Sequence, residues 1–341
     1  MLKVLFVLIL SILFSPFEAN AFEFKRINKI YDMLEKKHSH IADLKKISIT
    51  SMEELSKFDK NFRIYSSKSK IYVYYQNNLI DHFLVPNDNH NSLAWRDIIN
   101  NVLSIYCQHS PKISKDNIEL QLINTIAHNI DKYSRMEENV LKHKDIDHKI
   151  IDNVIYIKTE IFYNGLAEDI KGIVNSAPNV NGLILDFRNN VGGNFNEALK
   201  VSDLFLDNAL ITYSVENGNT NYYTSQEGDL IDGKKIVVLV NNNTASAAEI
   251  VAGALGEQSR AIIVGTRTFG KGSLQSVYHV KDNNLYITSG YTYTPSGKKI
   301  DEVGITPQIC TGIENSCNIT DSQNSSKDIL TAINLIKSNF A

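Results

Sequence analysis

The feature that most constrains the fold is a regular alternation of strand-like and helix-like segments that begins near Ile150. The strand-like segments are short apolar runs, GLILDFR, KIVVLV and AIIVG, and the helix-like segments between them include GLAEDIKGIVNS, FNEALKVSDLFL and ASAAEIVAGAL. Strands and helices that alternate in this way predict an α/β domain. We place this domain at residues 150–312, followed by a loop and a last helix at 313–341.

Upstream of this domain the pattern is different and predicts a smaller, mostly helical α+β domain at residues 22–134. Apolar residues at helical spacing predict helices over 24–47, 95–107 and 118–130. The β-rich runs IYVYY and LIDHFLV, separated by QNN within residues 63–85, predict a hairpin. Residues 135–149 are polar and charged, which is typical of a linker.

The first 21 residues predict a signal peptide. Lys3 precedes an apolar run that ends at Phe14, and the small residues Ala19 and Ala21 form an AxA-type cleavage site. The apolar run is too short for a comfortable membrane span, and no stop-transfer pattern follows it, which disfavours the alternative of an uncleaved anchor. We therefore expect an exported chain that starts near Phe22 and is periplasmic or secreted.

Composition narrows the classes of partner. The 341 residues carry a formal net charge of -3, which provides no general field for attracting nucleic acid. The tightest histidine cluster, HSH at 38–40, has no Cys or carboxylate partner at ligand spacing, so we expect no metal, and no motif calls for a cofactor. Cys310 and Cys317 share a polar loop, where a local disulfide is an open alternative in an oxidising compartment. Cys107 is expected to be a small buried side chain.

The stretch AIIVGTRTFGKGSLQ partly fits a phosphate-binding loop, because Gly265, Gly270 and Lys271 match the GxxxxGK part of the Walker A pattern. That pattern needs Ser or Thr after the lysine and a helix after the loop, whereas Gly272 and the strand-like SLQSVYHV follow here. We therefore exclude nucleotide binding. Burial lowers the pKa of an ammonium group, so a lysine enclosed by glycines can act as a base toward a hydroxyl. An exposed turn lysine is the alternative.

Two upstream segments supply the other parts of a candidate site. In VVLVNNNTASAAEIVAGAL, Ser246 stands at the start of a small-residue helix, where free amides and the helix dipole favour an alkoxide and an oxyanion. A plain helix cap is the alternative use of this serine, although Thr244 could fill that role. In GLILDFRNNVGGN, a strand ends at Asp186, and a glycine turn over 190–193 offers backbone amides.

Together these segments resemble peptidase family S41, the carboxy-terminal processing or tail-specific proteases. GLILDFRNNVGG is similar to the family's LILDLRNNPGG, NNNTASAAEI to its SASASEI segment, and VGTRTFGKGSLQ to its VGxxTFGKGxVQ. YTPSGKKIDEVGITPQI is similar to its YxTPxGxxIxxxGIxPD, and IAHNIDKYSRMEE resembles its LDPHSxYxxxxE more weakly. The first four motifs stand in the family's order over residues 182–309, which makes the match specific.

The resemblance implies an exported serine endopeptidase with a Ser/Lys dyad, which falls on Ser246 and Lys271. Gln275 matches the glutamine that orients the lysine, and the backbone amides of Gly192 and Ala247 match the oxyanion donors. The resemblance also implies a crotonase-like or ClpP-like spiral of ββα units for the catalytic domain. Protein or peptide substrates follow from it, C-terminal tails among them, while an adaptor or activating partner and homo-oligomers stay open.

The sequence departs from the family pattern in one respect, and one alternative function and one alternative mechanism stay open. Most members of the family carry a PDZ domain that binds the substrate tail by strand addition, but residues 136–150 are too few to hold one, so we expect it to be lacking. A non-catalytic relative that binds ligands or proteins is the alternative function. A histidine base, with His148 and His279 as candidates, is the alternative mechanism.

Overall fold

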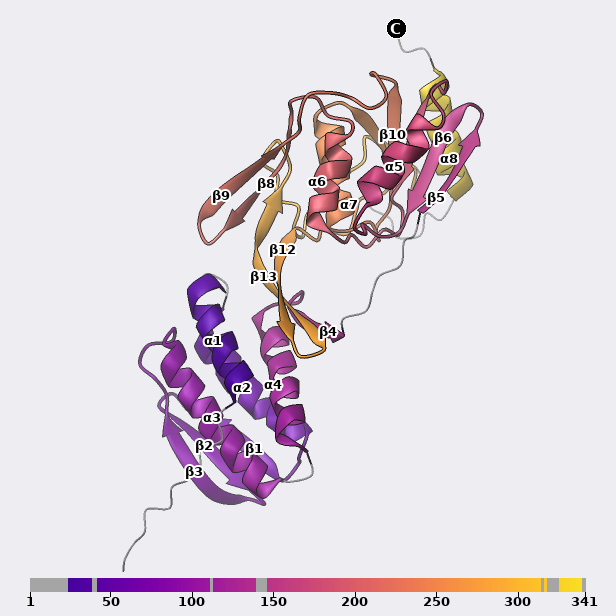
Figure 1. The fold of residues 1–341 in the computed structure, drawn as a ribbon. Coiled ribbons are helices and arrows are strands. Elements are labelled where there is room, and N and C mark those ends of the chain that lie inside the picture. The colour runs from indigo at the N-terminus through magenta and orange to yellow at the C-terminus, as the bar shows by residue number, and fades with distance from the viewer. Residues whose placement is uncertain are drawn as a thin grey trace, which may run out of the picture. The chain divides into compact units, whose positions relative to one another are not determined.

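The computed structural model describes residues 24–38, 42–110, 113–138, 146–313, 316–317 and 325–338 (Figure 1). The chain divides into two compact units, Met1–Ile130 and Asp131–Ala341. The signal peptide expected at 1–21 lies outside the described residues. Within the described ranges, no helix is long and apolar enough to cross a membrane.

The first unit combines helices with a small antiparallel sheet. Its elements are α1 (Lys25–His38), α2 (Leu44–Glu53), a short 3-10 helix η1 (Glu54–Lys57), β1 (Phe62–Ser66), β2 (Lys70–Tyr75), β3 (Asn78–Leu84), α3 (Ser92–His109) and α4 (Lys115–Ile130). The strands pair in the order β1-β2-β3. One face of the sheet is buried through alternate residues, among them Phe62, Ile71 and Val73, as expected where one side of a sheet packs on a core.

Two local predictions in this unit have different outcomes. The single helix expected over 24–47 is wrong, because Asp43 starts a second helix: its side chain accepts a hydrogen bond from Lys46 N at 3.0 Å and caps α2. The hairpin between β2 and β3 is confirmed. Gln76 and Asn77 form its turn with φ of 50° and 66°, the left-handed pair that two-residue hairpin loops require.

The second unit is built on a six-stranded sheet with the order β14-β11-β10-β7-β6-β5. Its elements are β5 (Ile146–Ile151), β6 (Val154–Thr159), α5 (Leu166–Asn175), β7 (Gly182–Asp186), α6 (Phe195–Asp203), β10 (Lys235–Val240), α7 (Ala247–Glu257), β11 (Ala261–Gly265), β14 (Ile309–Cys310) and α8 (Ser325–Lys337). All neighbouring strands are parallel except β5, which pairs antiparallel with β6. The mixed α/β class expected for this part of the chain is therefore confirmed.

Helices cover both faces of this sheet, which explains why its strands are continuous apolar runs. On one face, Leu183, Leu185 and Val238 pack with α5, α6 and α7 in a single core cluster. On the other face, Ile184 and Val237 pack against α8. Figure 1 shows α5, α6 and α7 grouped together and α8 beside β6.

A second sheet in this unit has the order β12-β13-β8-β9, with β4 paired to β13. Its strands are β4 (Arg135–Glu138), β8 (Leu210–Glu216), β9 (Asn219–Thr224), β12 (Ser273–Val280) and β13 (Asn283–Tyr293). The linker predicted at 135–149 is wrong at both of its described ends, because β4 and β5 occupy them. Charged side chains suit an edge strand as well as a linker, and composition alone does not separate the two.

A buried carboxylate joins the starts of α5 and α6. Glu197 accepts hydrogen bonds from Ala167 N at 3.1 Å and from Lys200 Nζ at 2.9 Å. Burial alone would raise the pKa of Glu197, but the bonds from Lys200 and from the backbone of Ala167 and Gly165 outweigh burial and lower it. The ionised form of Glu197 therefore stabilises the folded state more than the protonated form does.

Candidate functional site

The predicted site residues come largely from one edge of the six-stranded sheet. β7, β10 and β11 are parallel neighbours, and the loops that leave their carboxyl ends cover residues 187–194, 241–246 and 266–272. In open α/β sheets this edge is where ligands bind. Backbone hydrogen bonds tie the loops together: Phe187 N to Leu239 O (2.9 Å), Ala245 N to Asn190 O (2.8 Å) and Phe269 N to Thr244 O (2.9 Å).

Ser246 lies at the N-cap of α7 in a strained backbone conformation. Its φ of 57° and ψ of −119° fall outside the regions that residues with a side chain favour. Strain of this kind persists only where surrounding bonds impose it, and it clusters at functional sites. Thr244 does not cap the helix, since its hydroxyl donates to Phe187 O at 2.7 Å and accepts from Asn241 N at 2.9 Å. Ser246 thus stands at the positive end of the α7 dipole.

The glycine turn passes directly against Ser246. A Cβ placed on Gly192, where φ is 92°, would lie 2.6 Å from Ser246 Cβ and 3.1 Å from Ala247 N, so only glycine fits. Ala247 is the first residue of α7, where N–H groups have no partner within the helix. The Gly192 amide donates to Asn190 Oδ1 at 2.8 Å. In this conformation the turn itself therefore uses one of the two expected oxyanion donors.

Glu249, on the first turn of α7, joins the serine loop to the lysine loop. Its Oε2 accepts hydrogen bonds from the backbone N of Ser246 and of Lys271, each at 2.8 Å. Its Oε1 accepts from Gly270 N at 2.7 Å and from Thr268 Oγ1 at 2.5 Å. The two backbone nitrogens on Oε2 cannot be farther apart than twice 2.8 Å. Burial raises the pKa of Glu249, although these four donors act in the opposite direction.

Lys271 and Gln275 lie beside Tyr133, in the segment that leads into β4. Lys271 Nζ is 5.5 Å from the centre of the Tyr133 ring. Gln275 follows an irregularity in the β12–β13 pairing between Leu274 and Gln275, and such bulges redirect side chains. Gln275 Nε2 donates to Tyr133 O at 2.7 Å, and its Oε1 accepts from Arg135 Nη1 at 3.1 Å.

A buried charge network supports the strand that leads to the glycine turn. Arg188 pairs with Asp186 at 2.5 Å and with Asp328 of α8 at 2.9 Å. Tyr156 donates its hydroxyl to Asp186 Oδ2 at 2.6 Å. Burial disfavours the charge of Arg188, but the two carboxylates outweigh it and raise its pKa. Removing one partner would leave a buried charge uncompensated, so this network fixes the start of the turn.

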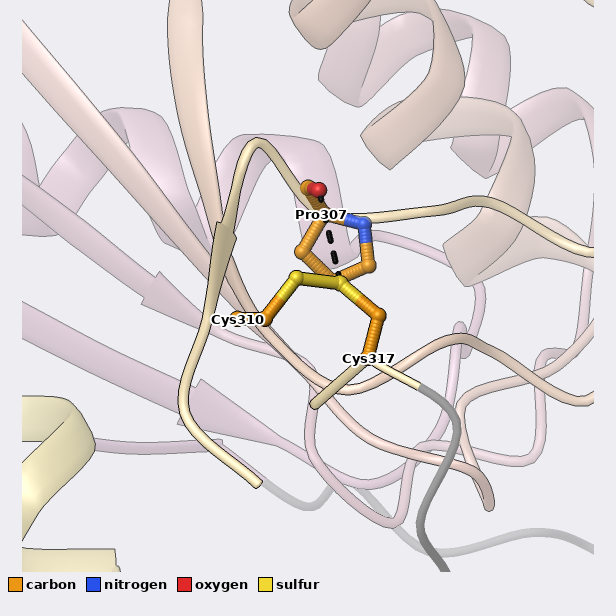
Figure 2. Close-up of a disulfide and its surroundings, with 3 residues drawn as sticks. All are labelled: Pro307, Cys310 and Cys317. Atoms are coloured by element: carbon orange, nitrogen blue, oxygen red, sulfur yellow. Dashed lines mark hydrogen bonds between the residues drawn. A yellow bond between two sulfur atoms is a disulfide. The ribbon is translucent and has the colours of Figure 1, made fainter. Parts of the chain in front are cut away.

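Cys310 and Cys317 form a disulfide in the structure (Figure 2). The Cys317 sulfur lies 3.8 Å from Pro307 O. Cys310 ends β14, and Cys317 O accepts a hydrogen bond from Arg267 N at 2.8 Å. The bridge therefore holds a loop against the start of the segment that leads to Lys271.

Other residues considered from the sequence lie elsewhere. His148 is exposed on the edge strand β5, and His279 is exposed on β12, where its Nδ1 is 2.8 Å from Asn284 Oδ1. Neither is on the three loops that hold the site. Cys107 is a half-buried free thiol on α3, and burial raises its pKa. Among the described residues, no group of three His, Cys, Asp or Glu side chains is arranged to hold a metal ion.

Three residues with contacts to the site were not predicted from the sequence. Glu249 was recognisable, because Ser246-x-x-Glu249 has the spacing of a capping box. Tyr133 and Arg135 lie in IAHNIDKYSRMEE, which resembles a family motif only weakly, and they are far from Gln275 in the chain.

Comparison with known proteins gives consistent results. Residues 153–311 match the model of peptidase family S41. A carboxy-terminal-processing protease of Bartonella bacilliformis is 37% identical over 184 residues, which are 51% of this chain and 42% of that protein. Carboxyl-terminal-processing peptidase 3, chloroplastic, of Arabidopsis thaliana is 37% identical over 210 residues, 59% of this chain and 40% of that protein. The matched part thus spans less than half the length of these relatives.

A solved structure supports the fold independently. A lipoprotein from Streptococcus agalactiae aligns with a TM-score of 0.50 and 18% identity, covering 62% of this chain and 84% of that one. At this identity the likeness bears on the fold alone. The order of the motifs, the loops they form at one sheet edge and the match of the family model agree, and residues 153–311 of this chain belong to peptidase family S41.

Proposed function

We propose that this protein is an exported serine endopeptidase that cleaves protein substrates through an acyl-enzyme on Ser246, with Lys271 as the base. The observation that carries the proposal is the double use of Glu249, whose Oε2 binds the backbone N–H of both residues at 2.8 Å. A nucleophile and its base need a fixed mutual geometry, and a shared buried acceptor provides it. The similarity to processing proteases supports the same class of activity.

In the proposed reaction, neutral Lys271 takes the proton of Ser246 Oγ while Oγ bonds to the carbonyl carbon of the substrate. The N–H of Ala247 and the N–H of Gly192 hold the oxyanion, and the latter must first release Asn190 Oδ1. Lys271 passes its proton to the leaving amine as the C–N bond breaks. Water then hydrolyses the ester and frees Ser246.

Activity should fall in acid, because protonated Lys271 cannot accept the serine proton. Glu249 also titrates, and since burial raises its pKa, acid weakens its hold on both loops as well. The isosteric change Glu249→Gln separates the two groups. An acid limb that persists in this variant belongs to Lys271, whereas a limb that disappears belongs to Glu249.

The choice of substrate belongs to the same proposal. We expect flexible protein segments, C-terminal tails included, because only a flexible segment can bring its peptide carbonyl to Ser246 Oγ in the orientation for attack. The part of the chain at 22–134 would select substrates or gate the site, alone or with an adaptor. Export through residues 1–21 and a spiral arrangement of ββα units complete the proposal.

A second candidate is a binding protein that keeps the fold and does not turn over substrate. One observation favours it: the Gly192 amide is bonded to Asn190 Oδ1 instead of facing a substrate. A latent protease that becomes active when a ligand displaces the Gly192–Asn190 hydrogen bond would show this same bond in its inactive state. Cleavage assays with and without candidate partners distinguish these states.

The test is cleavage of an unfolded, exported-type protein by the chain from Phe22 onward. We expect Ser246→Ala and Lys271→Ala to lower kcat by at least about a thousandfold while the fold is kept. Ser176→Ala and Lys171→Ala, on the exposed side of the end of α5, are matched controls that should cut at the rate of the unaltered protein. Cleavage that survives in Ser246→Ala would disprove the serine mechanism.

A further inference from the structure

We propose that Arg135 is a positioning residue of the lysine side of the site and acts through Gln275. This inference rests on the proposed function, because it assigns Gln275 the task of orienting Lys271. It concerns a residue of β4, a strand that lies outside the loops carrying the dyad.

The contacts of Gln275 fix the orientation of its amide group. Its Nε2 donates to Tyr133 O at 2.7 Å, and its Oε1 accepts from Arg135 Nη1 at 3.1 Å. A carbonyl oxygen only accepts and a guanidinium only donates, so exchanging the two ends of the amide would break both bonds. The side chain is thus held in one of its two possible orientations, with its oxygen on the side of Arg135.

Arg135 is itself held firmly. Its Nη1 also donates to Tyr133 O at 3.0 Å, its Nε pairs with Glu137 at 2.5 Å, and its guanidinium lies 4.5 Å from the centre of the Tyr286 ring. Pairing of β4 with β13 fixes the backbone, with Arg135 opposite Tyr286. A planar donor with several partners loses little freedom on binding one more acceptor.

The consequence for Lys271 follows from the acceptor capacity of an amide oxygen. Gln275 Oε1 has two lone pairs, and one bond to Arg135 leaves the second able to accept from an ammonium. Tyr133 links the parts, because its carbonyl binds Gln275 and Arg135 while its ring faces Lys271 Nζ at 5.5 Å. Without Arg135, only the bond to Tyr133 O holds the amide, which then turns more readily and presents to the lysine an NH₂ group that repels it.

The experiment is a double-mutant cycle on Arg135 and Gln275, measured as kcat and KM with an unfolded protein substrate. We expect Arg135→Ala to lower kcat about tenfold, as for loss of one charge-assisted bond, with KM within about twofold. Arg135→Lys should recover part of kcat, since an ammonium still donates. In a Gln275→Ala background, Arg135→Ala should cause no further loss.

Lys132→Ala is the matched control. Lys132 is a cation in the same segment, is more than half exposed and pairs with Glu302 at 3.0 Å, and it should leave kcat unchanged. Equal losses in Lys132→Ala and Arg135→Ala would overturn the proposal, because the effect would then be one of surface charge. Full additivity of Arg135→Ala and Gln275→Ala would overturn it too.

A readout that needs no turnover keeps this inference separate from the proposed function. The side-chain NH₂ signals of Gln275, assigned by their loss in Gln275→Ala, should shift and exchange faster with water in Arg135→Ala and stay unchanged in Lys132→Ala. Unchanged Gln275 signals in a folded Arg135→Ala protein would refute the positioning role. Inactivity of the unaltered protein would count against the proposed function, while these signals still decide the role of Arg135.

Discussion

Replacing Glu249 by alanine should destabilise the second unit and abolish catalysis. The side chain is 0% exposed and accepts four hydrogen bonds. Two donors, Gly270 N and Thr268 Oγ1, are buried, and an orphaned buried donor costs about 2 kcal/mol, which gives about 4 kcal/mol in total. The partly buried donors, Ser246 N and Lys271 N, regain bonds to water. Glu249→Gln keeps the shape of the side chain but places an NH₂ group opposite hydrogen-bond donors. It should therefore lower the free energy of unfolding by about 2 kcal/mol.

Urea unfolding followed by circular dichroism measures the loss of stability, and hydrogen exchange of the 266–272 loop reports the local effect. Glu257→Gln, at the opposite end of α7 from Ser246, is the control, because Glu257 accepts hydrogen bonds from Ser296 N and Oγ, each at 2.8 Å. It should cost about 1 kcal/mol or less and leave kcat unchanged. A Glu249→Ala protein that keeps its kcat, or that loses no more stability than Glu257→Gln, would refute the role of Glu249 as the link between the loops.

Three further predictions concern stability. Gly193→Ala should cost at least about 2 kcal/mol in urea unfolding, since its φ is 147° and a Cβ would lie 2.3 Å from a backbone carbonyl oxygen, whereas Gly218→Ala has open space and should cost less. Reducing the Cys310–Cys317 bridge should lower stability by about 2 kcal/mol and speed hydrogen exchange of the lysine loop; a Cys310→Ser, Cys317→Ser protein should not respond to the reductant. Because the folded pKa of Glu197 is lowered from 4.5, its contribution is present above pH 4.5 and is lost as pH falls through the folded pKa, so Glu197→Gln should flatten the acid side of the stability profile.

The parts of the fold that could be predicted from the sequence are those set by short-range patterns. β7, β10 and β11 are recognisable because burial on both faces makes each a continuous apolar run. The hairpin of β8 and β9 was missed, although Asn217 and Gly218, at φ 48° and 78°, form the Asn-Gly turn that is the strongest local hairpin signal. The two residues of this turn specify it by themselves, without tertiary contacts.

The candidate site also has a part that could be predicted from the sequence and a part that could not. Ser246, Lys271 and Gln275 follow from motifs whose residues are close in the chain. The bond between Arg135 and Gln275 joins positions 140 residues apart, and it depends on the pairing of β4 with β13. A polar edge strand of four residues has no periodic pattern of apolar residues from which it could be predicted. Long-range polar contacts of this kind become visible only when the backbone is known.

The disulfide segment and α8 bear on when the site can form during synthesis of the chain. In the loop of Lys271, Arg267 N donates a backbone hydrogen bond to Cys317 O, and Arg188, beside the glycine turn, pairs with the carboxylate of Asp328. Both partners come after every residue of the proposed dyad. A growing chain that has already delivered Ser246 and Lys271 still lacks these two supports, so a fully braced site is a late event, reached after most of the domain has left the ribosome.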